Sequence, residues 1–166
     1  MKHIFLNRHA KSDWNHPGLN DFERPLNNRG MKDAPMMGLR LHENETGIEL
    51  IISSPAKRAI TTANIMAEKL NYPLKNIRQE PTIYDAGVRD LLKLINNLDD
   101  ELSSVLMFGH NPGFTDLADY LTGSGILNIP TCGICKISFD LNSWKEVSAH
   151  TGHLVYFDFP KREIVK

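Results

Sequence analysis

The most constraining feature of this sequence is an apolar run within residues 104–108, Val-Leu-Met-Phe after Ser104, which ends at Gly109. A strand with one solvated face alternates apolar and polar side chains, whereas a continuous apolar run needs cover on both faces. Strands of that kind belong to parallel sheets, because the helical crossovers between parallel strands pack over the sheet. The run therefore predicts a sheet between two layers of helices.

The rest of the chain supplies strands and helices in alternation, as such a fold requires. We expect strands at residues 2–7, 49–53 and 104–108, a loop or short strand at 77–83, helices at 27/28–41, 57–70, 88–98 and 112–121, and strands at 132–141, 144–147 and 154–159. The first two of those last three strands look antiparallel. The pattern predicts a three-layer α/β/α sandwich in one domain over residues 1–166, mostly parallel, with antiparallel C-terminal strands.

The first predicted helix contains a local conflict. Asn27 or Asn28 can cap its start, because an asparagine side chain accepts a hydrogen bond from a free backbone N–H. Pro35 lies inside the helix, so the helix either starts later or is kinked there. The apolar side chains expected to face the core are Met31, Met36, Met37, Leu39 and Leu41.

Composition restricts the functional classes that need to be considered. The 166 residues carry a net charge of -1, with 41% hydrophobic and 23% charged residues, which is typical of a globular domain. Such a balance provides no broad basic surface for nucleic acid or an anionic membrane. The sequence also has no signal peptide and no run of about 18 apolar residues. We therefore expect a cytoplasmic protein in which any basic site is local.

Cys132 and Cys135 form a C-x-x-C pair, a spacing found in redox and zinc sites. The surrounding segment alternates like a strand, so residues three apart should point to opposite faces of the sheet. No second pair is present to complete a zinc site. We therefore interpret both cysteines as structural residues.

Three polar clusters follow predicted strands. Arg8-His9 ends the first strand, Ser53-Ser54-Pro55 with Arg58 follows the second, and Gly109-His110-Asn111 follows the apolar run. Ligands of open α/β sheets gather beyond the carboxyl ends of the strands. The sequence therefore predicts two histidines and two arginines at one edge of the sheet.

That set of side chains suits phosphoryl transfer. The oxygens of a transferring phosphoryl group need fixed positive charge, and arginine provides a planar pair of donors that stays charged. A neutral imidazole can attack phosphorus and divide one displacement into two steps. A second histidine can be protonated against the phosphate. We therefore expect neither metal nor cofactor.

The same residues resemble a known family. Arg8-His9-Ala10 is similar to the Arg-His-Gly/Ala signature of the histidine phosphatase superfamily, branch one, which includes the cofactor-dependent phosphoglycerate mutases. A narrower resemblance is to the SixA-type phosphohistidine phosphatases. It covers Glu23-Arg24-Pro25-Leu26, Gly30, Ser53 to Ala59, Thr62 and Gly109-His110-Asn111-Pro112. The resemblance runs in order from the first strand to about Thr131 and implies a phosphoglycerate mutase-like fold.

The resemblance assigns roles residue by residue. His9 would be the nucleophile that becomes phosphorylated, and Arg8 and Arg58 would hold the phosphate. His110 would donate a hydrogen bond to the phosphoryl group. Arg24 would lie at the edge of the pocket and help bind phosphate or substrate.

The sequence departs from the larger members of the family in one place. Those members carry an acidic general acid in an insertion before the second histidine, and here Asp85 lies nearest to that position. SixA-type enzymes manage with little or no such acid, so Asp85 either serves as the acid or has no part in the chemistry. A missing cap also leaves the pocket open, which favours a phosphate carried on a protein.

Two further candidate residues keep structural alternatives. Arg24 can instead form a salt bridge with Asp21 or Asp33 that fastens the loop. Asn111 either orients its loop or reaches the substrate.

Three functions follow from these observations. The first is a phosphatase acting on phosphohistidine or other phosphorylated residues of a protein, such as a histidine-phosphotransfer domain. The second is an enzyme for small phosphate esters, either a phosphatase or a mutase. The third is a phosphate-binding interaction module without catalysis. We expect a monomer or weak dimer in each case.

Overall fold

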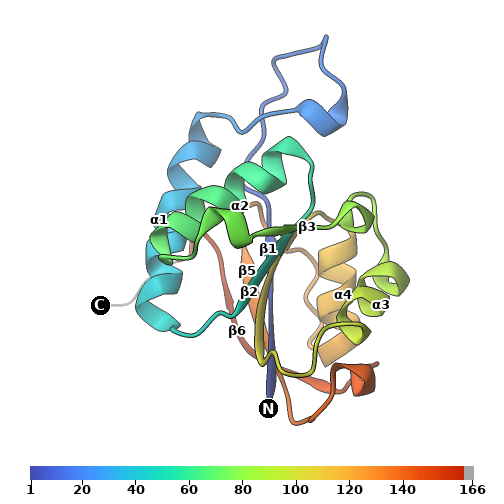
Figure 1. The fold of residues 1–166 in the computed structure, drawn as a ribbon. Coiled ribbons are helices and arrows are strands. Elements are labelled where there is room, and N and C mark those ends of the chain that lie inside the picture. Colours follow the sequence, from blue (N-terminus) through green and yellow to red (C-terminus); the bar gives the residue numbers. More distant parts are fainter. Residues whose placement is uncertain (163–166) are drawn as a thin grey trace.

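The computed structural model describes residues 1–162 and contains one six-stranded sheet with helices on both faces (Figure 1). The strands are β1 (Lys2–Arg8), β2 (Leu50–Ser53), β3 (Arg78–Gln79), β4 (Ser104–Gly109), β5 (Ile134–Phe139) and β6 (Gly152–Asp158). Their order is β3-β2-β4-β1-β5-β6. The pairs among β1 to β4 are parallel, whereas β5 is antiparallel to both β1 and β6. The predicted sheet is confirmed.

Two helices cover each face of the sheet. Helices α1 (Asn28–Asn44) and α2 (Lys57–Lys69) lie on one side, and α3 (Val88–Asn96) and α4 (Gly113–Thr122) lie on the other (Figure 1). Short 3-10 helices complete the connections at η1 (Asp21–Glu23), η2 (Leu74–Asn76), η3 (Pro81–Ile83) and η4 (Trp144–Glu146). The three-layer α/β/α arrangement is therefore also confirmed.

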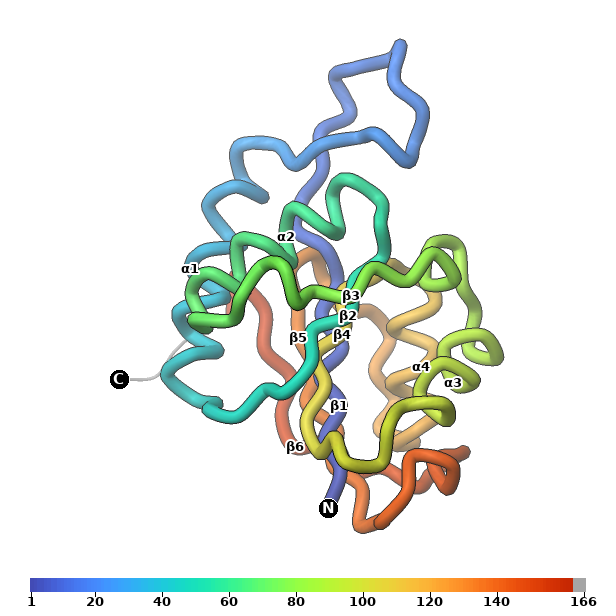
Figure 2. Tube along the Cα trace, in the orientation of Figure 1, coloured from blue at the N-terminus to red at the C-terminus, as the bar shows by residue number. Residues whose placement is uncertain are grey.

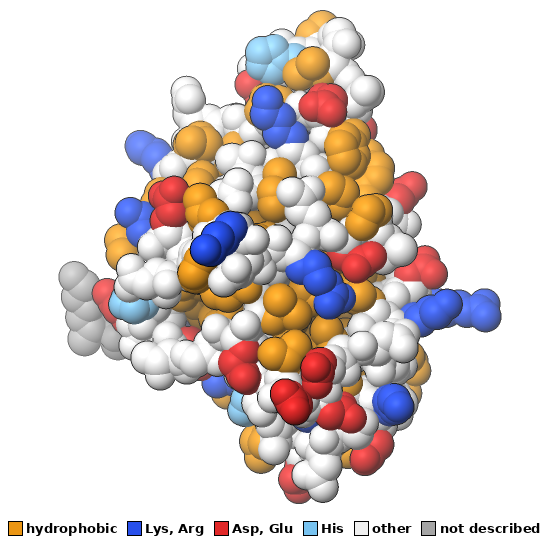
Figure 3. Space-filling view, in the orientation of Figure 1, with side chains coloured by type: hydrophobic (Ala, Val, Ile, Leu, Met, Phe, Trp, Pro, Cys, Tyr) orange, Lys and Arg blue, Asp and Glu red, His pale blue; other side chains and the backbone are white. Residues whose placement is uncertain are grey.

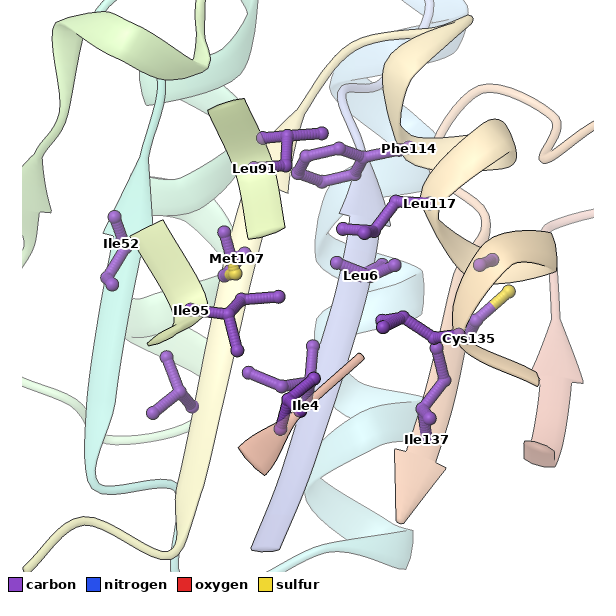
Figure 4. Close-up of a cluster of buried hydrophobic side chains, with 14 of the residues drawn as sticks. Ile4, Leu6, Ile52, Leu91, Ile95, Met107, Phe114, Leu117, Cys135 and Ile137 are labelled. Atoms are coloured by element: carbon purple, nitrogen blue, oxygen red, sulfur yellow. The ribbon is translucent and has the colours of Figure 1, made fainter. Parts of the chain in front are cut away.

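Strand β4 lies inside the sheet, between β1 and β2, and is covered on both faces. Val105 and Met107 pack into the cluster under α3 and α4, while Leu106 and Phe108 pack into the cluster under α1 and α2. Figure 4 shows the first cluster, where side chains from the strands meet those of α3 and α4. The continuous apolar run is explained by this burial on both sides.

Helix α1 resolves the conflict around Pro35. The Asn27 side chain accepts a hydrogen bond from the N–H of Gly30 at 2.9 Å, so Asn27 is the cap. The helix runs without interruption from Asn28 to Asn44 with Pro35 inside it. Met37 and Leu41 are buried as predicted, but the prediction was wrong for Met31, Met36 and Leu39, which are exposed. One helix can bury only the side chains that repeat every three or four residues along one face.

The predicted strand at 144–147 was wrong. Residues Trp144–Glu146 form a 3-10 helix whose start is capped by the Ser143 side chain. The Trp144 ring is fully buried, and its indole N–H donates to the carbonyl oxygens of Asp99 and Leu102 at 3.1 and 3.0 Å. These bonds fix the segment as a turn, because a tryptophan N–H must find an acceptor when it is buried.

The two cysteines are free and buried. Cys132 packs in the cluster beneath α1 and α2, whereas Cys135 packs in the cluster on the other face. The expected placement on opposite faces is confirmed. Burial raises the pKa of each thiol to about 12, which keeps both protonated at neutral pH.

A long loop, residues 13–25, extends past the carboxyl ends of the parallel strands (Figure 2). The base of this 13–25 loop is closed by backbone hydrogen bonds from Asp13 to Pro25 at 2.7 Å and from Asn27 to Lys11 at 3.0 Å. Gly30 of α1 lies directly against this closure, because a Cβ at that position would overlap the backbone carbonyl of Lys11. Helix α1 thereby holds the base of the loop.

We expect Gly30→Ala to lower the free energy of unfolding by about 1–3 kcal/mol, because the added methyl group must displace backbone. Gly18→Ala is the matched control, since Gly18 lies in the 13–25 loop with open space around its Cα. Urea unfolding of both variants measures the difference. Equal stability of the two variants would contradict the proposed contact between α1 and the base of the loop.

Candidate active site

The three predicted polar clusters meet in a cavity of about 230 Å³ beyond the ends of β1, β2 and β4. Arg8 is the last residue of β1, Arg58 is the second residue of α2, and His110 directly follows β4. The cavity is lined by Arg8, His9, Lys11, Ser12, Trp14, Arg24, Arg58, His110, Asn111 and Thr131. The structure thus brings together every predicted site residue except Asp85.

His9 is buried, with 7% of its surface exposed. Its Nδ1 lies 2.7 Å from the carbonyl oxygen of Ala10, which can only accept a hydrogen bond. Nδ1 must therefore carry the proton in the neutral ring, and Nε2 keeps a free lone pair. Burial lowers the pKa of His9 to about 3, and the charges of its basic neighbours act in the same direction. His9 is therefore an unprotonated nitrogen base at neutral pH.

His110 lies beside His9, with 5.2 Å between the ring centroids. Its Nε2 is 2.8 Å from the Ser54 hydroxyl, while its Nδ1 is buried with no hydrogen-bond partner. Burial, reinforced by the charge of Arg58, lowers the pKa of His110 to about 4. The ring is neutral in the protein alone, and a phosphate dianion beside it would raise that pKa again.

Arg8 and Arg58 are each held by a backbone oxygen. Arg8 donates to the carbonyl of Ile129 at 3.0 Å, and Arg58 donates to the carbonyl of Asp21 at 2.7 Å. Burial lowers the pKa of Arg8, and the neighbouring charge of Arg58 lowers it further. Two like charges out of water are unfavourable together unless an anion is nearby.

Unsatisfied polar atoms concentrate on residues that line this cavity. Within residues 1–162, the buried side-chain nitrogen and oxygen atoms without a partner are Nε of Arg8, Arg24 and Arg58, Nδ1 of His110 and Oδ1 of Asn7. Four of the five belong to residues that line the cavity. Folded proteins leave few such atoms, because each costs about 1–3 kcal/mol. Three guanidinium groups and an imidazole suit an anion with several oxygens.

For Arg24 the predicted salt bridge with Asp21 is confirmed, and the side chain also lines the cavity. Its guanidinium forms the salt bridge with Asp21 at 2.8 Å and stacks on Trp14 at 3.7 Å from the ring centroid. Lining the cavity and fastening the 13–25 loop are therefore compatible for this side chain.

Sequence reasoning missed the wider contacts of Asp21. Its carboxylate accepts hydrogen bonds from Arg24 at 2.8 Å, from Arg58 at 3.0 Å and from the Tyr84 hydroxyl at 2.6 Å. The spacing of three residues to Arg24 indicated one of these partners. The other two come from distant segments, and no local pattern could have revealed them.

Asp85 and Asn111 are the two remaining predicted site residues. Asp85 is exposed and lines an adjoining cavity of about 420 Å³, with Tyr84 and the Ala86-Gly87 turn. Its φ of 64° is the left-handed conformation that aspartate tolerates better than most residues. Asn111 lines both cavities, but its side chain donates to Ile129 and accepts from Thr115, at 2.9 and 2.8 Å. These bonds favour the loop-orienting role for Asn111.

Four basic side chains line the cavity, those of Arg8, Lys11, Arg24 and Arg58. On the face shown in Figure 3, acidic and basic side chains are interspersed with apolar ones. Across residues 1–162, no three His, Cys, Asp or Glu side chains are grouped as a metal site would need, and no helix is long and apolar enough to cross a membrane.

The lowered histidine pKa values predict how stability depends on pH. Between about pH 3 and 6.5 the unfolded chain binds a proton at His9 that the folded chain does not, so stability should fall as pH drops below 6.5 and level off above it. His9→Gln should reduce this slope, measured by urea unfolding from pH 4.5 to 7.5. The reduction should exceed that of His153→Gln, which removes an exposed histidine on β6. Equal slopes would contradict the buried, neutral state of His9.

Comparison with known proteins gives relatives of this chain. It is 29% identical to an uncharacterised chloroplast protein of Arabidopsis thaliana over 91% of this chain and 72% of that one. The crystal structure of a protein assigned as phosphohistidine phosphatase SixA in Agrobacterium tumefaciens superposes with a TM-score of 0.80 at 25% identity, over 96% and 98% of the two chains. The protein histidine phosphatase SixA complexed with tungstate superposes with a TM-score of 0.78 at 23% identity, over 95% and 97%.

The sequence model of the histidine phosphatase superfamily, branch 1, matches residues 4–90, which is more than half of the 166 residues. That segment includes the first two polar clusters, around His9 and Arg58, and the structural matches extend the similarity across the third. The chain therefore belongs to branch 1 of the histidine phosphatase superfamily, and its fold is similar to that of the SixA structures.

Proposed function

We propose that this protein is a metal-independent phosphatase in which His9 is the nucleophile. The observation that carries the proposal is the pair of unpaired buried guanidinium donors on Arg8 and Arg58, together with the unpaired Nδ1 of His110, around an unprotonated His9. Those donors match the oxygens of a phosphoryl group, and the lone pair on Nε2 can reach its phosphorus. Family membership supports phosphatase activity independently of this geometry.

The reaction has two displacements. In the first, Nε2 of His9 forms a bond to phosphorus while the bond from phosphorus to the leaving group breaks and that group takes the electron pair. In the second, water attacks phosphorus, the bond to Nε2 breaks, and phosphate leaves with the protons of the water. Arg8 and Arg58 stabilise the charge on the phosphoryl oxygens in both steps.

His110 and Ser54 share one hydrogen bond, and its direction decides which ring nitrogen of His110 carries the proton. If the Ser54 hydroxyl donates to Nε2 of His110, the ring proton resides on Nδ1, the atom without a partner. A phosphoryl oxygen supplies the missing acceptor. The negative charge of that oxygen also favours the protonated ring, so His110 gains positive charge when substrate binds.

The substrate that we propose is phosphohistidine, or another phosphorylated residue, on a partner protein such as a histidine-phosphotransfer domain. The cavity opens at the surface beside Trp14, whose side chain is 71% exposed. A protonated imidazole leaves phosphorus readily without a general acid, and Asp85 lies outside the central cavity. A similar solved structure, at 25% identity, is described as a phosphohistidine phosphatase SixA, which supports the same substrate class. The enzyme would act in the cytoplasm as an uncapped single domain.

A small phosphate ester is the second candidate substrate. The adjoining cavity of about 420 Å³ shares Arg58, His110 and Asn111 with the first, so it could receive the alcohol part of a small ester. Comparing the two substrate types decides between these proposals. A protein phosphohistidine turned over more slowly than the small esters would favour the second.

His9→Asn should lower turnover of phosphohistidine and of p-nitrophenyl phosphate by at least about 10³-fold, because the nucleophile is removed. Wild-type activity should survive EDTA and be blocked by vanadate. His16→Asn removes an exposed histidine of the 13–25 loop and should remain active. Activity that depends on added metal and resists vanadate would contradict the mechanism.

Asp85→Asn separates the two possible roles of Asp85. If Asp85 is the general acid, the variant should lose about 10²-fold in rate on an alkyl phosphate, whose leaving group needs a proton, and little on phosphohistidine. Asp90→Asn, on the exposed start of α3, is the control for a lost charge. Equal rates of wild type and Asp85→Asn on the alkyl phosphate would exclude Asp85 from the chemistry.

A further inference from the structure

Asp21 contacts Arg24 and Arg58, the two arginines of the cavity that do not belong to β1. Its carbonyl oxygen accepts from one terminal nitrogen of Arg58 at 2.7 Å, and its carboxylate accepts from the other at 3.0 Å. Its second carboxylate oxygen accepts from Arg24 at 2.8 Å. One residue of the 13–25 loop therefore binds two guanidinium groups at once.

The two bonds to Arg58 fix the orientation of its guanidinium plane. A planar group held through both terminal nitrogens cannot rotate without losing one bond. Arg58 is 6% exposed, so water cannot readily replace a lost partner. The direction of the N–H groups that Asp21 does not use is therefore set by Asp21.

The Asp21 carboxylate is itself held in place. The Tyr84 hydroxyl donates to the oxygen that binds Arg58, at 2.6 Å, and Tyr84 packs edge-on against the ring of His110. The hydrogen bond from Arg24 is the main reason that the pKa of Asp21 lies well below its usual range, and bonds from Tyr84 and Arg58 act in the same direction. Asp21 is therefore an anion at neutral pH and has no proton to donate to a leaving group.

We propose that Asp21 is a positioning residue for phosphoryl transfer, which holds Arg58 and Arg24 so that their remaining N–H groups meet the phosphoryl oxygens. The inference rests on the proposed function of this cavity. It adds a carboxylate to a site otherwise built from positive and neutral groups, and it gives the 13–25 loop a part in the reaction.

If these contacts had a different role, the change in anion affinity on removal of the Asp21 charge would have the opposite sign. If Asp21 only competed with phosphate for the arginines, removing its charge would free them and tighten anion binding. If Asp21 positions them, removing it lets Arg58 turn, and anion binding weakens although the cavity becomes more positive. The direction of the change in vanadate affinity therefore separates the two roles.

The test measures vanadate inhibition and the kinetics of p-nitrophenyl phosphate hydrolysis for Asp21→Asn. We expect vanadate to bind about 10-fold more weakly, as for the loss of a hydrogen bond between charged groups. We expect kcat/KM to fall by about 10- to 100-fold, because a misplaced group loses transition-state contacts. The fractional loss of kcat/KM should be the same from pH 5 to 8, since Asp21 stays ionised. Unchanged or tighter vanadate binding would overturn the proposal.

Three further variants make the result specific. Glu23→Gln removes the same charge from an exposed position in the same 3-10 helix and should leave both quantities unchanged. Asp21→Glu keeps the charge but shifts it by one methylene, so it should stay impaired if position matters and recover if only charge matters. Tyr84→Phe removes one donor to Asp21 and should weaken vanadate binding less than Asp21→Asn does.

Failure of this inference is distinguishable from failure of the proposed function. A wild-type protein that hydrolyses phosphate esters, with an Asp21→Asn variant that matches it, would overturn only the role of Asp21. A wild-type protein that neither hydrolyses them nor binds vanadate would overturn the phosphatase itself. Urea unfolding of each variant confirms that it is folded before its kinetics are compared.

Discussion

Arg8 and Arg58 line the same small cavity, and two like charges that are partly removed from water are unfavourable together unless an anion neutralises them. The arrangement around them follows from that constraint. His9 and His110 stay neutral, because burial and the arginines both lower their pKa values. Asp21 supplies one negative charge from the surface side. A phosphoryl group would supply the rest, in contact with donors that have no other partner.

The fold places these groups by the geometry of its strands. Parallel β1, β2 and β4 end at the same edge of the sheet, so Arg8, Arg58 and His110 converge although they are far apart in the sequence. Buried apolar side chains on both faces of β4 hold that edge rigidly, and rigid elements position reacting groups better than loops do. The 13–25 loop then adds Arg24 and Asp21 from above the edge. Rigid strands and one closed loop together build the cavity.

Much of the fold and the position of the site could be predicted from the sequence, because both depend on local patterns of residues. The apolar run before Gly109 indicated a sheet buried on both faces, and the polar residues after each strand indicated where the site lies. The contacts of Asp21 with Arg58 and Tyr84 could not be predicted, since they join segments brought together only by the folded loop. Residues 144–147 were assigned to a strand, but the buried Trp144 indole donates to the distant carbonyl oxygens of Asp99 and Leu102, and the segment forms a 3-10 helix. The exposed Met31 and Met36 show that apolar residues in a helix need not all face the core.

The proposed mechanism depends most on a covalent bond between His9 and phosphorus. Single-turnover reaction with a labelled phosphohistidine protein, stopped under alkaline denaturing conditions that preserve phosphohistidine, tests that bond directly when the peptide containing His9 is examined by mass spectrometry. We expect one transient phosphoryl group per chain, attached at Nε2 of His9, because Nδ1 carries a proton that it donates to the carbonyl oxygen of Ala10. Full turnover with no phosphorylated His9, or with the phosphoryl group on another residue, would contradict it.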